Sequence, residues 1–185
     1  VIKGLTLDDE KVREIIQMQE KLATTFTRKR TKGAIGIYPL DKITFPITFT
    51  AKTPKEIKFT PLGDVKSRSA DDILSMHPKG KEFAHILKKF AKYPVFLDAK
   101  NKIVSMPPII NADDVGKVET KTKDIFVEVT GPSKHICTKA LNMLASALID
   151  MGGSCFAVEI GRESTPDFTP QKIAINLNDI NKLLG

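Results

Sequence analysis

Two adjacent prolines, Pro107 and Pro108, constrain the fold of this chain more than any other feature. Neither residue can donate a hydrogen bond to a β-sheet, and each has a fixed backbone angle φ. They follow a predicted strand at residues 103–105, which a turn joins to an earlier strand at residues 95–97. The chain must therefore leave the sheet, or run along its edge, through residues 106–111. We interpret this rigid run as the wall of a pocket; the alternative is an ordinary exit from an edge strand.

A third predicted strand, at residues 125–130, alternates between two kinds of side chain. Phe126, Glu128 and Thr130 lie on one face, and the opposite face is wholly apolar, as expected of a side that packs on a core. The face with the polar side chains allows two interpretations. It is either the solvent face that an antiparallel sheet commonly has, or the floor of a pocket in which Glu128 accepts a hydrogen bond.

Five segments are predicted as helices, most of them from apolar side chains at three- and four-residue intervals. Ser133 is suited to cap the best of these helices, and the Gly152–Gly153 pair is suited to end it. Ser69 is suited to cap a shorter helix, which Pro78 and Gly80 should then end. The predicted helices cover residues 7–26, 69–76, 81–91, 133–151 and 178–185.

Further strands are predicted at residues 34–38, 47–51, 57–59, 154–160 and 173–177, and residues 161–170 are expected to be a loop. The turn at residues 99–101 joins antiparallel strands, so Phe96 and Ser105 should lie close across a ladder. We therefore predict an α+β fold. Its core would be a mixed, mostly antiparallel β-sheet, barrel- or sandwich-like, flanked by several helices.

The most basic run of the chain, residues 28–32, begins with Arg28, Lys29 and Arg30. It follows the first predicted helix and is either a solvated connector or a contact for phosphate groups, and the pattern favours neither. The formal net charge of +7 permits a nucleic-acid partner, because lysine and arginine neutralise phosphates and release counterions. The charge alone does not establish such a partner.

Composition and spacing argue against several classes of protein. No run approaches the ~20 apolar residues that a membrane span needs, and the first residues lack the apolar core of a signal peptide. Cys137, Cys155 and the three histidines have no metal-ligand spacing, so we expect no structural zinc. Two cysteines without a disulfide framework fit a reducing cytoplasm. Because the chain begins with Val1 and not Met, we expect a piece of a longer protein.

Three further groups of reactive side chains receive a structural interpretation. Asp113 and Asp114 are adjacent in a predicted loop, where neighbouring carboxylates usually point apart into solvent. Cys137 lies in the apolar stripe of its helix and is expected to pack there. His85 lies beside the face that should bury Phe90, which suits a packed, hydrogen-bonded histidine. The chain also has no dinucleotide fingerprint, no P-loop and no Gly-x-Ser-x-Gly elbow.

Three stretches of the chain carry a family resemblance: residues 93–95, 105–111 and 126–131. They read YPV, SMPPIIN and FVEVTG. Together they resemble the editing domain of the archaeal and eukaryotic type of phenylalanyl-tRNA synthetase beta subunit. The resemblance covers nearly the whole chain, and the SMPPIIN run is its most specific motif.

The resemblance implies hydrolysis of the ester that joins a wrongly attached tyrosine to phenylalanine tRNA. It implies that Ser105 and Thr130 act in catalysis, and that Lys117, where the family commonly has arginine, is a tRNA contact. Arg28, Lys29 and Arg30 are the other expected tRNA contacts. The expected substrate-binding residues are Phe96, where the family has an aliphatic side chain, and Pro107, Pro108, Asn111, Glu128 and Gly131.

The resemblance also implies the setting of this domain. Residues 1–170 would form the editing domain, and residues 171–185 would begin the following domain or form a linker strand and helix. The partners would be the acceptor end of tRNA(Phe) carrying tyrosine and the synthetase alpha subunit, in the cytoplasm and away from membranes. No cofactor or metal is expected for this domain, since ATP and magnesium belong to the synthetic site of the parent enzyme.

An acidic residue in the pocket explains how tyrosine could be distinguished from phenylalanine, which lacks only the hydroxyl. A site built to hydrogen-bond a hydroxyl rejects the analogue without it by roughly 10⁴–10⁵-fold, because a buried polar group is then left unpaired. Glu128 would be this sensor and not the base. An activated water would attack the ester, positioned by Ser105, Thr130 or backbone amides near Asn111 and Gly131, with help from the tRNA ribose hydroxyl. The alternative is a non-catalytic tRNA-binding or scaffold module of the synthetase.

Overall fold

The computed structural model describes residues 1–170 and 172–184. Within these ranges it confirms the α+β class: every strand pair is antiparallel, and no sheet closes into a barrel. The helices are α1 (Asp9–Thr24), α2 (Ala70–Met76), α3 (Pro78–Leu87), α4 (Lys134–Asp150) and α5 (Leu177–Leu184). Two short 3₁₀ helices, η1 (Leu40–Lys42) and η2 (Pro54–Glu56), lie in the connections.

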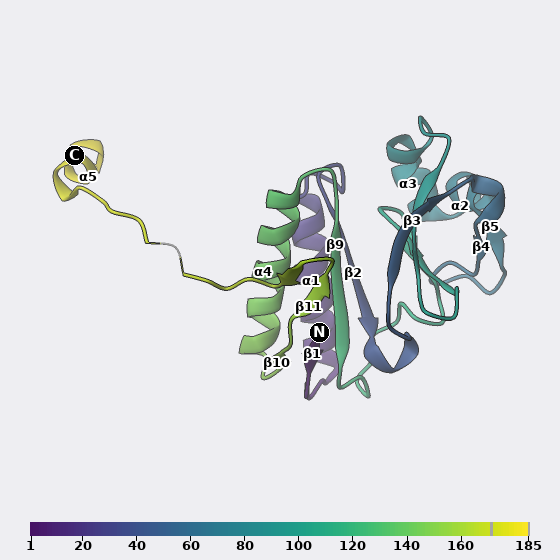
Figure 1. The fold of residues 1–185 in the computed structure, drawn as a ribbon, viewed down its shortest axis with the longest axis horizontal. Helices are drawn as coiled ribbons and strands as arrows, with labels where there is room; N and C mark the ends of the chain where they lie inside the picture. The colour runs from purple at the N-terminus through teal and green to yellow at the C-terminus, as the bar shows by residue number, and fades with distance from the viewer. Residues whose placement is uncertain (171, 185) are drawn as a thin grey trace.

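The first lobe is a four-stranded sheet with two helices on one face (Figure 1). The strand order is β10 (Ser154–Cys155), β1 (Ile2–Lys3), β9 (Ile125–Thr130) and β2 (Ala34–Pro39). The helices α1 and α4 pack on this sheet through apolar side chains of β1, β2 and β9. Local capping fixes where each helix begins, since Asp8 accepts the Lys11 N–H at 2.8 Å and Ser133 accepts the Ile136 N–H at 3.5 Å.

The second lobe lies on the other face of this sheet (Figure 1). It holds a sheet of order β3 (Thr48–Lys52), β6 (Tyr93–Leu97), β7 (Ile103–Met106) and β8 (Ile110–Asn111). The helices α2 and α3 and a pair of short strands, β4 (Lys58–Phe59) and β5 (Arg68–Ser69), complete it. The register of β6 and β7 pairs Phe96 with Ser105, which confirms the predicted hairpin.

Strand β9 is buried on both faces. Ile125 and Val127 pack against the helices of the first lobe, as predicted for its apolar face. Phe126, on the opposite face, packs with the apolar residues of the second lobe, and Glu128 on the same face is only 7% exposed. The interpretation of this face as solvent surface is therefore wrong, because the second lobe covers it. Each fully buried large apolar side chain contributes about 1.5–3 kcal/mol to this packing.

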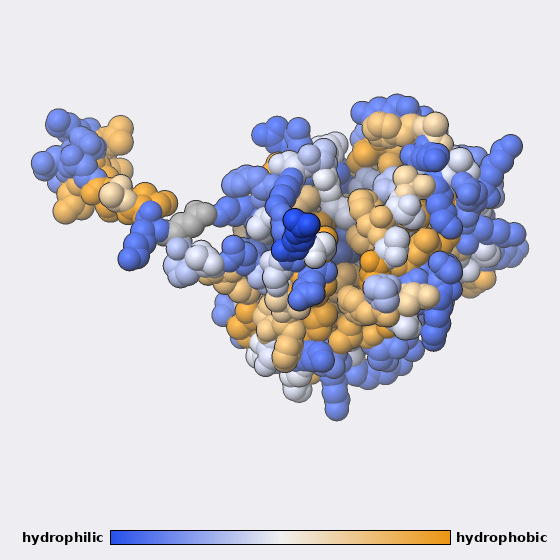
Figure 2. Space-filling view, in the orientation of Figure 1, coloured by the Kyte–Doolittle hydropathy of each residue, from blue (hydrophilic) through white to orange (hydrophobic). Residues whose placement is uncertain are grey.

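The surface between the lobes is partly apolar. Figure 2 shows hydrophobic residues gathered over β3 and along the junction of the two lobes, with hydrophilic residues over much of the remaining face. Phe45 and Phe49 are 41% and 54% exposed in this region. Their rings pack on Phe126 and Phe96, with centroids 5.3 and 4.8 Å apart.

The second helix ends at Met76, just before Pro78, as predicted, but the third helix begins earlier than the predicted residue 81. It begins at Pro78, because a proline in the first turn lacks only an N–H that would be unpaired anyway. His77 caps α3 by accepting the Lys79 N–H at 3.2 Å. Gly80 is buried where α2 and α3 meet. If Gly80 had a Cβ atom, that atom would lie only 1.7 Å from the Ile73 carbonyl oxygen. Phe90, expected to be buried, lies after α3 and is 54% exposed.

The C-terminal predictions are correct only in part. The predicted strand at residues 154–160 is two strands, β10 and β11 (Val158–Ile160), which belong to different sheets. The predicted loop after it contains β12 (Glu163–Thr165), the partner of β11. No strand lies within residues 172–176, whereas the predicted last helix exists as α5, whose first turn Asn176 caps. Gln171 and Gly185, the ends of the predicted second domain, lie outside the described residues, and that domain boundary stays a prediction.

Among the described residues, no helix is both long and apolar enough to cross a membrane.

The close approach of α2 and α3 can be tested by substituting Gly80. We expect Gly80→Ala to lower the free energy of unfolding by about 1–3 kcal/mol, because the added methyl group must displace backbone. This loss should appear although alanine favours helices over glycine by about 1 kcal/mol. Denaturant unfolding measures it, with Lys81→Ala, an exposed position of the same helix, as the control. Unchanged stability of Gly80→Ala would contradict the packing described here.

Candidate functional site

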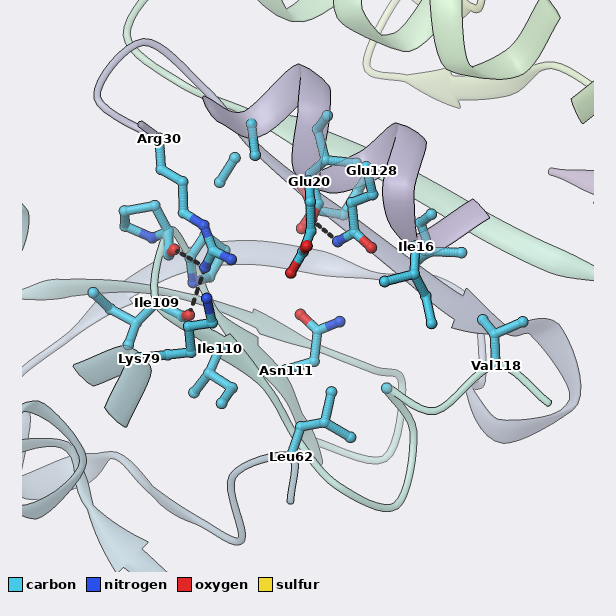
Figure 3. A pocket seen from close by; sticks show the side chains of 18 of the residues that line it. Ile16, Glu20, Arg30, Leu62, Lys79, Ile109, Ile110, Asn111, Val118 and Glu128 are labelled. Carbon is cyan, nitrogen blue, oxygen red and sulfur yellow. Dashed lines mark hydrogen bonds between the residues drawn. The ribbon is translucent and has the colours of Figure 1, made fainter. Parts of the chain in front are cut away.

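A cleft of about 370 Å³ lies where the two lobes meet (Figure 3). On the first lobe it is lined by α1 and by β2, which is the edge strand of its sheet. On the second lobe it is lined by residues 107–111, by the first turn of α3 and by residues 116–118. The run of two prolines therefore forms a wall of a cleft, as its rigidity predicted.

Glu128 reaches this cleft from β9 with a buried carboxyl group. Its Oε1 accepts a hydrogen bond from the Tyr38 hydroxyl at 3.2 Å. The Asn111 Oδ1 lies equally close to the same hydroxyl, also at 3.2 Å. The other carboxyl oxygen of Glu128, Oε2, has no hydrogen-bond partner among the described residues. One oxygen of the carboxyl group is thus held by the protein, and the other is buried without a hydrogen-bond partner.

Gly36 makes the contact between Tyr38 and Glu128 possible. It lies directly opposite Glu128 in the β2–β9 ladder and two residues before Tyr38, on the same face. A Cβ at this position would lie 2.3 Å from the Tyr38 hydroxyl oxygen and 2.5 Å from Glu128 Oε1. The groups that approach Gly36 closely are therefore these two side chains.

Burial raises the pKa of the Glu128 carboxyl from 4.5 to about 8. The Tyr38 hydroxyl and then Thr130 act in the opposite direction. The pKa of Tyr38 itself is raised well above 10, mainly by burial and next by the neighbouring Glu128. A carboxyl group with a pKa near neutrality, in a cleft and with a free oxygen, is typical of a functional site.

Ser105 and Phe96 lie beside this centre on the second lobe. The β7–β8 ladder pairs Ser105 with Asn111, whose side chain contacts Tyr38. Ser105 is buried, and its Oγ has no hydrogen-bond partner within the described part of the chain. Two buried oxygen atoms without partners, Ser105 Oγ and Glu128 Oε2, therefore belong to one small region around Tyr38, where buried polar groups ordinarily find partners.

Arg30 ties the two lobes together. Its Nη1 donates to the Pro108 carbonyl at 3.0 Å and to the Ile109 carbonyl at 2.9 Å (Figure 3). Its guanidinium also lies over the ring of Phe83, 4.3 Å from the centroid. These contacts fix the proline wall relative to the first lobe. Arg30 is thus a structural residue of the cleft, besides its predicted role as a tRNA contact.

An unusual backbone segment presents Arg30. Arg28, Lys29 and Arg30 have φ values of 49°, 50° and 63°, in the left-handed region that costs a residue with a side chain about 1–2 kcal/mol. The Lys29 and Arg30 N–H groups donate to carbonyls of the last turn of α1, at 3.1 Å each. The basic run is a turn between α1 and β2 whose conformation aims Arg30 at the cleft and leaves Arg28 and Lys29 exposed to solvent. Its contact with phosphate groups stays a prediction.

The structure brings only some of the predicted site residues to the cleft. The cleft is lined by Arg30, Pro107, Pro108, Asn111, Lys117 and Glu128. Phe96, Ser105, Thr130 and Gly131 do not line it, and Arg28 and Lys29 lie outside it. Thr130 follows Glu128 on the same face of β9, and Ser105 pairs with Asn111 in the other sheet. The roles of all these residues stay predictions.

Tyr38 and Glu20 are site residues that the sequence reading missed. The signal for Tyr38 was its place two residues after a strand glycine, on the same face of β2. The signal for Glu20 was its place on the first helix beside the buried Ala23, both of which line the cleft. Neither position could be connected to Glu128 from local pattern alone. Within residues 1–170 and 172–184, no three His, Cys, Asp or Glu side chains are grouped to hold a metal ion.

Comparison with known proteins gives a consistent set of relatives. No family model matches the chain. It is 40% identical over its whole length to the phenylalanine–tRNA ligase beta subunits of Thermococcus sibiricus and Pyrococcus horikoshii, and 39% identical to that of Methanococcus aeolicus. In each case it spans 34% of the relative, about one third.

A solved structure agrees with these relatives. The crystal structure of an N-terminal fragment of the phenylalanyl-tRNA synthetase beta subunit from Pyrococcus horikoshii is 39% identical. It superimposes with a TM-score of 0.91, over 99% of this chain and 54% of that one. The two chains therefore share a fold along nearly the whole length described here.

The raised pKa of Glu128 predicts a pH-dependent stability. Between pH 4.5 and about 8 the unfolded chain loses the Glu128 proton while the folded chain keeps it, so stability falls as pH rises through this window. The full fall is roughly 5 kcal/mol for this one group. Denaturant unfolding from pH 4 to pH 9 measures this fall as the difference in the free energy of unfolding between the wild-type protein and Glu128→Gln, which has no carboxyl group at this position to titrate. If this difference in free energy does not change with pH, the result would contradict the burial of Glu128.

Proposed function

We propose that this chain, which is homologous along its length to phenylalanine–tRNA ligase beta subunits, is an editing domain of such a subunit. It would hydrolyse the ester of tyrosine wrongly attached to tRNA(Phe). The partners would be the acceptor end of that tRNA and the alpha subunit of the synthetase, in the cytoplasm. ATP and magnesium would serve the synthetic site of the parent enzyme, and the editing step would use neither.

The observation that carries this proposal is the free oxygen of Glu128. The Tyr38 hydroxyl occupies Oε1, and Oε2 is buried without a partner beside the cleft. A phenol already donates to one oxygen of this carboxyl group, so a second phenol, that of a tyrosyl ester, is a fitting ligand for the other. Either protonation state of Glu128 can pair with a hydroxyl, as acceptor when ionised and as donor or acceptor when neutral.

Because Glu128 Oε2 is buried, the hydroxyl of the bound amino acid would decide which ester binds well. A tyrosyl ester would give Oε2 the hydrogen bond that it lacks. A phenylalanyl ester would exclude water and leave Oε2 unpaired, at a cost of about 1–3 kcal/mol or more for a charged group. A purely apolar pocket cannot achieve this, because it rejects an added hydroxyl only weakly. Phenylalanyl-tRNA(Phe), the correct product, would therefore bind the cleft weakly and escape hydrolysis, because it has no hydroxyl to pair with Oε2.

Hydrolysis needs a water molecule placed at the ester carbonyl. In the proposed step the water oxygen forms a bond to the carbonyl carbon, and the bond from that carbon to the ribose oxygen breaks. The ribose oxygen takes a proton from the water, so the products are free tyrosine and the ribose hydroxyl. The groups proposed to position the water are Ser105, whose Oγ has no partner in the described structure, and Thr130, which lies two residues after Glu128 on the same face of β9. The ribose hydroxyl beside the ester is proposed to assist.

The tRNA would approach over the basic residues around the cleft. Arg28 and Lys29 are exposed beside Arg30, and Lys117 lines the cleft on the opposite wall. Exposed cations of this kind neutralise phosphates without reading sequence. Their proposed role is to hold the acceptor end while Glu128 reads the amino acid.

Substitution of Glu128 tests the proposed function. With the full-length subunit assembled in its synthetase, Glu128→Ala should slow deacylation of tyrosyl-tRNA(Phe) by roughly 2–10-fold near neutral pH. This is the loss of one hydrogen bond between neutral groups, because the raised pKa keeps Glu128 protonated there. Glu128→Gln should fall between this variant and the wild type, because an amide still pairs with a hydroxyl. Slow hydrolysis of phenylalanyl-tRNA(Phe) should change little or rise.

The control is Glu159→Ala, an exposed carboxylate on β11 away from the cleft, which should leave both rates unchanged. Equal deacylation of tyrosyl-tRNA(Phe) by the wild type and by Glu128→Ala would sink the assignment of Glu128. If the wild-type enzyme bound the tRNA but deacylated neither ester, the chain would instead be the non-catalytic tRNA-binding or scaffold module.

A further inference from the structure

A second carboxylate, Glu20, enters the cleft from helix α1. Glu20 lines the cleft, and Figure 3 shows its side chain pointing into the cavity toward the wall that holds Asn111 and Lys79. It forms no side-chain hydrogen bond or ion pair with any of the residues that the structure describes. The neighbouring Gln19 donates to the Ile35 carbonyl at 2.8 Å and so fixes this turn of α1 against β2. Glu20 is therefore exposed to solvent at the cleft, and its two oxygen atoms have no partner among the described residues.

The cations that line the same cleft are already engaged. Arg30 donates to two carbonyl groups of the proline wall. Lys79 pairs with Glu82 at 3.3 Å, and Lys117 pairs with Glu119 at 3.4 Å. Glu20 is near enough to Arg30 to oppose the lowering of the arginine pKa by burial, yet it makes no hydrogen bond to it. Each of these three cations thus already has an acceptor within the protein, whereas Glu20 has no partner among the described residues.

The ligand group that suits these acceptors is a primary ammonium. Carboxylate oxygens of Glu20 and the amide oxygen of Asn111 face the same space, and an ammonium group carries three donors for such oxygens. A charge-assisted bond between the two is roughly twice as strong as a neutral one. In the proposed substrate the ammonium is the α-amino group of the amino acid, which is largely protonated near neutral pH.

We propose that Glu20 receives the α-ammonium group of the aminoacyl ester, so that the cleft holds the amino acid at both ends. This inference rests on the proposed function and adds a second specificity determinant to it. Glu128 reads the side-chain hydroxyl, and Glu20 reads the amine. A substrate whose amine is acylated has no charge and a bulky group at that position, so it is disfavoured.

The test compares two esters that differ only at the amine. Tyrosyl-tRNA(Phe) and N-acetyl-tyrosyl-tRNA(Phe) are deacylated by the full-length subunit in its synthetase, as wild type and as Glu20→Gln. The matched control is Glu14→Gln, an exposed position of the same helix that does not line the cleft. Glu128→Gln is assayed alongside to report on the proposed function separately.

Glu20→Gln should lower kcat/KM for tyrosyl-tRNA(Phe) by about 10–100-fold, the range of one hydrogen bond to a charged group, mainly through KM. It should change the rate for the N-acetyl ester less than about twofold, because that ester has no ammonium group to lose. The wild type should prefer the free amine by a similar factor, and Glu14→Gln should behave as wild type.

Two results would overturn the inference while the proposed function stands: no effect of Glu20→Gln on either ester, or an equal loss for both. In each case tyrosyl-tRNA(Phe) is still deacylated by the wild type, and Glu128→Gln still slows that reaction. Failure of the proposed function is different, because the wild type would then deacylate neither ester, and the assignment of Glu20 would fall with it.

Discussion

Burial of strand β9 on both faces is the constraint on which the rest of the site depends. Helices α1 and α4 cover one face, and the second lobe covers the other. This packing removes the Glu128 carboxyl from water, raises its pKa to about 8 and leaves Oε2 without a partner. It is stable because the contacts of Ile125, Val127 and Phe126 outweigh the cost of one buried acid. The proposed discrimination between tyrosine and phenylalanine is a consequence of this burial.

The cleft also depends on how the two lobes are held. Arg30 donates to the carbonyls of Pro108 and Ile109 from a left-handed turn that is anchored on the last turn of α1. The Tyr38 hydroxyl makes a second bridge, because it lies between Glu128 of the first lobe and Asn111 of the second. Both contacts connect one wall of the cleft to the other. The shape of the cleft is therefore fixed, before a ligand binds, by side chains that are far apart in the sequence.

Local patterns predicted what depends on local physics. The strand at residues 125–130 followed from alternation, and the pairing of Phe96 with Ser105 followed from a short turn. The contact of Tyr38 with Glu128 spans 90 residues, and that of Arg30 with Pro108 spans 78, so no local pattern could reveal them. The position of the cleft and much of its lining could not be predicted from local patterns, because both depend on how the two lobes pack.

The central claim is that Glu128 pairs with the substrate hydroxyl through the oxygen that the protein leaves free. A crystal structure with a non-hydrolysable tyrosyl-adenosine amide tests it most directly. The claim predicts the phenol oxygen of the ligand about 2.5–3.0 Å from Glu128 Oε2, with Tyr38 still on Oε1. A ligand whose phenol oxygen points to solvent, or lies in the cleft without touching Glu128, would contradict it.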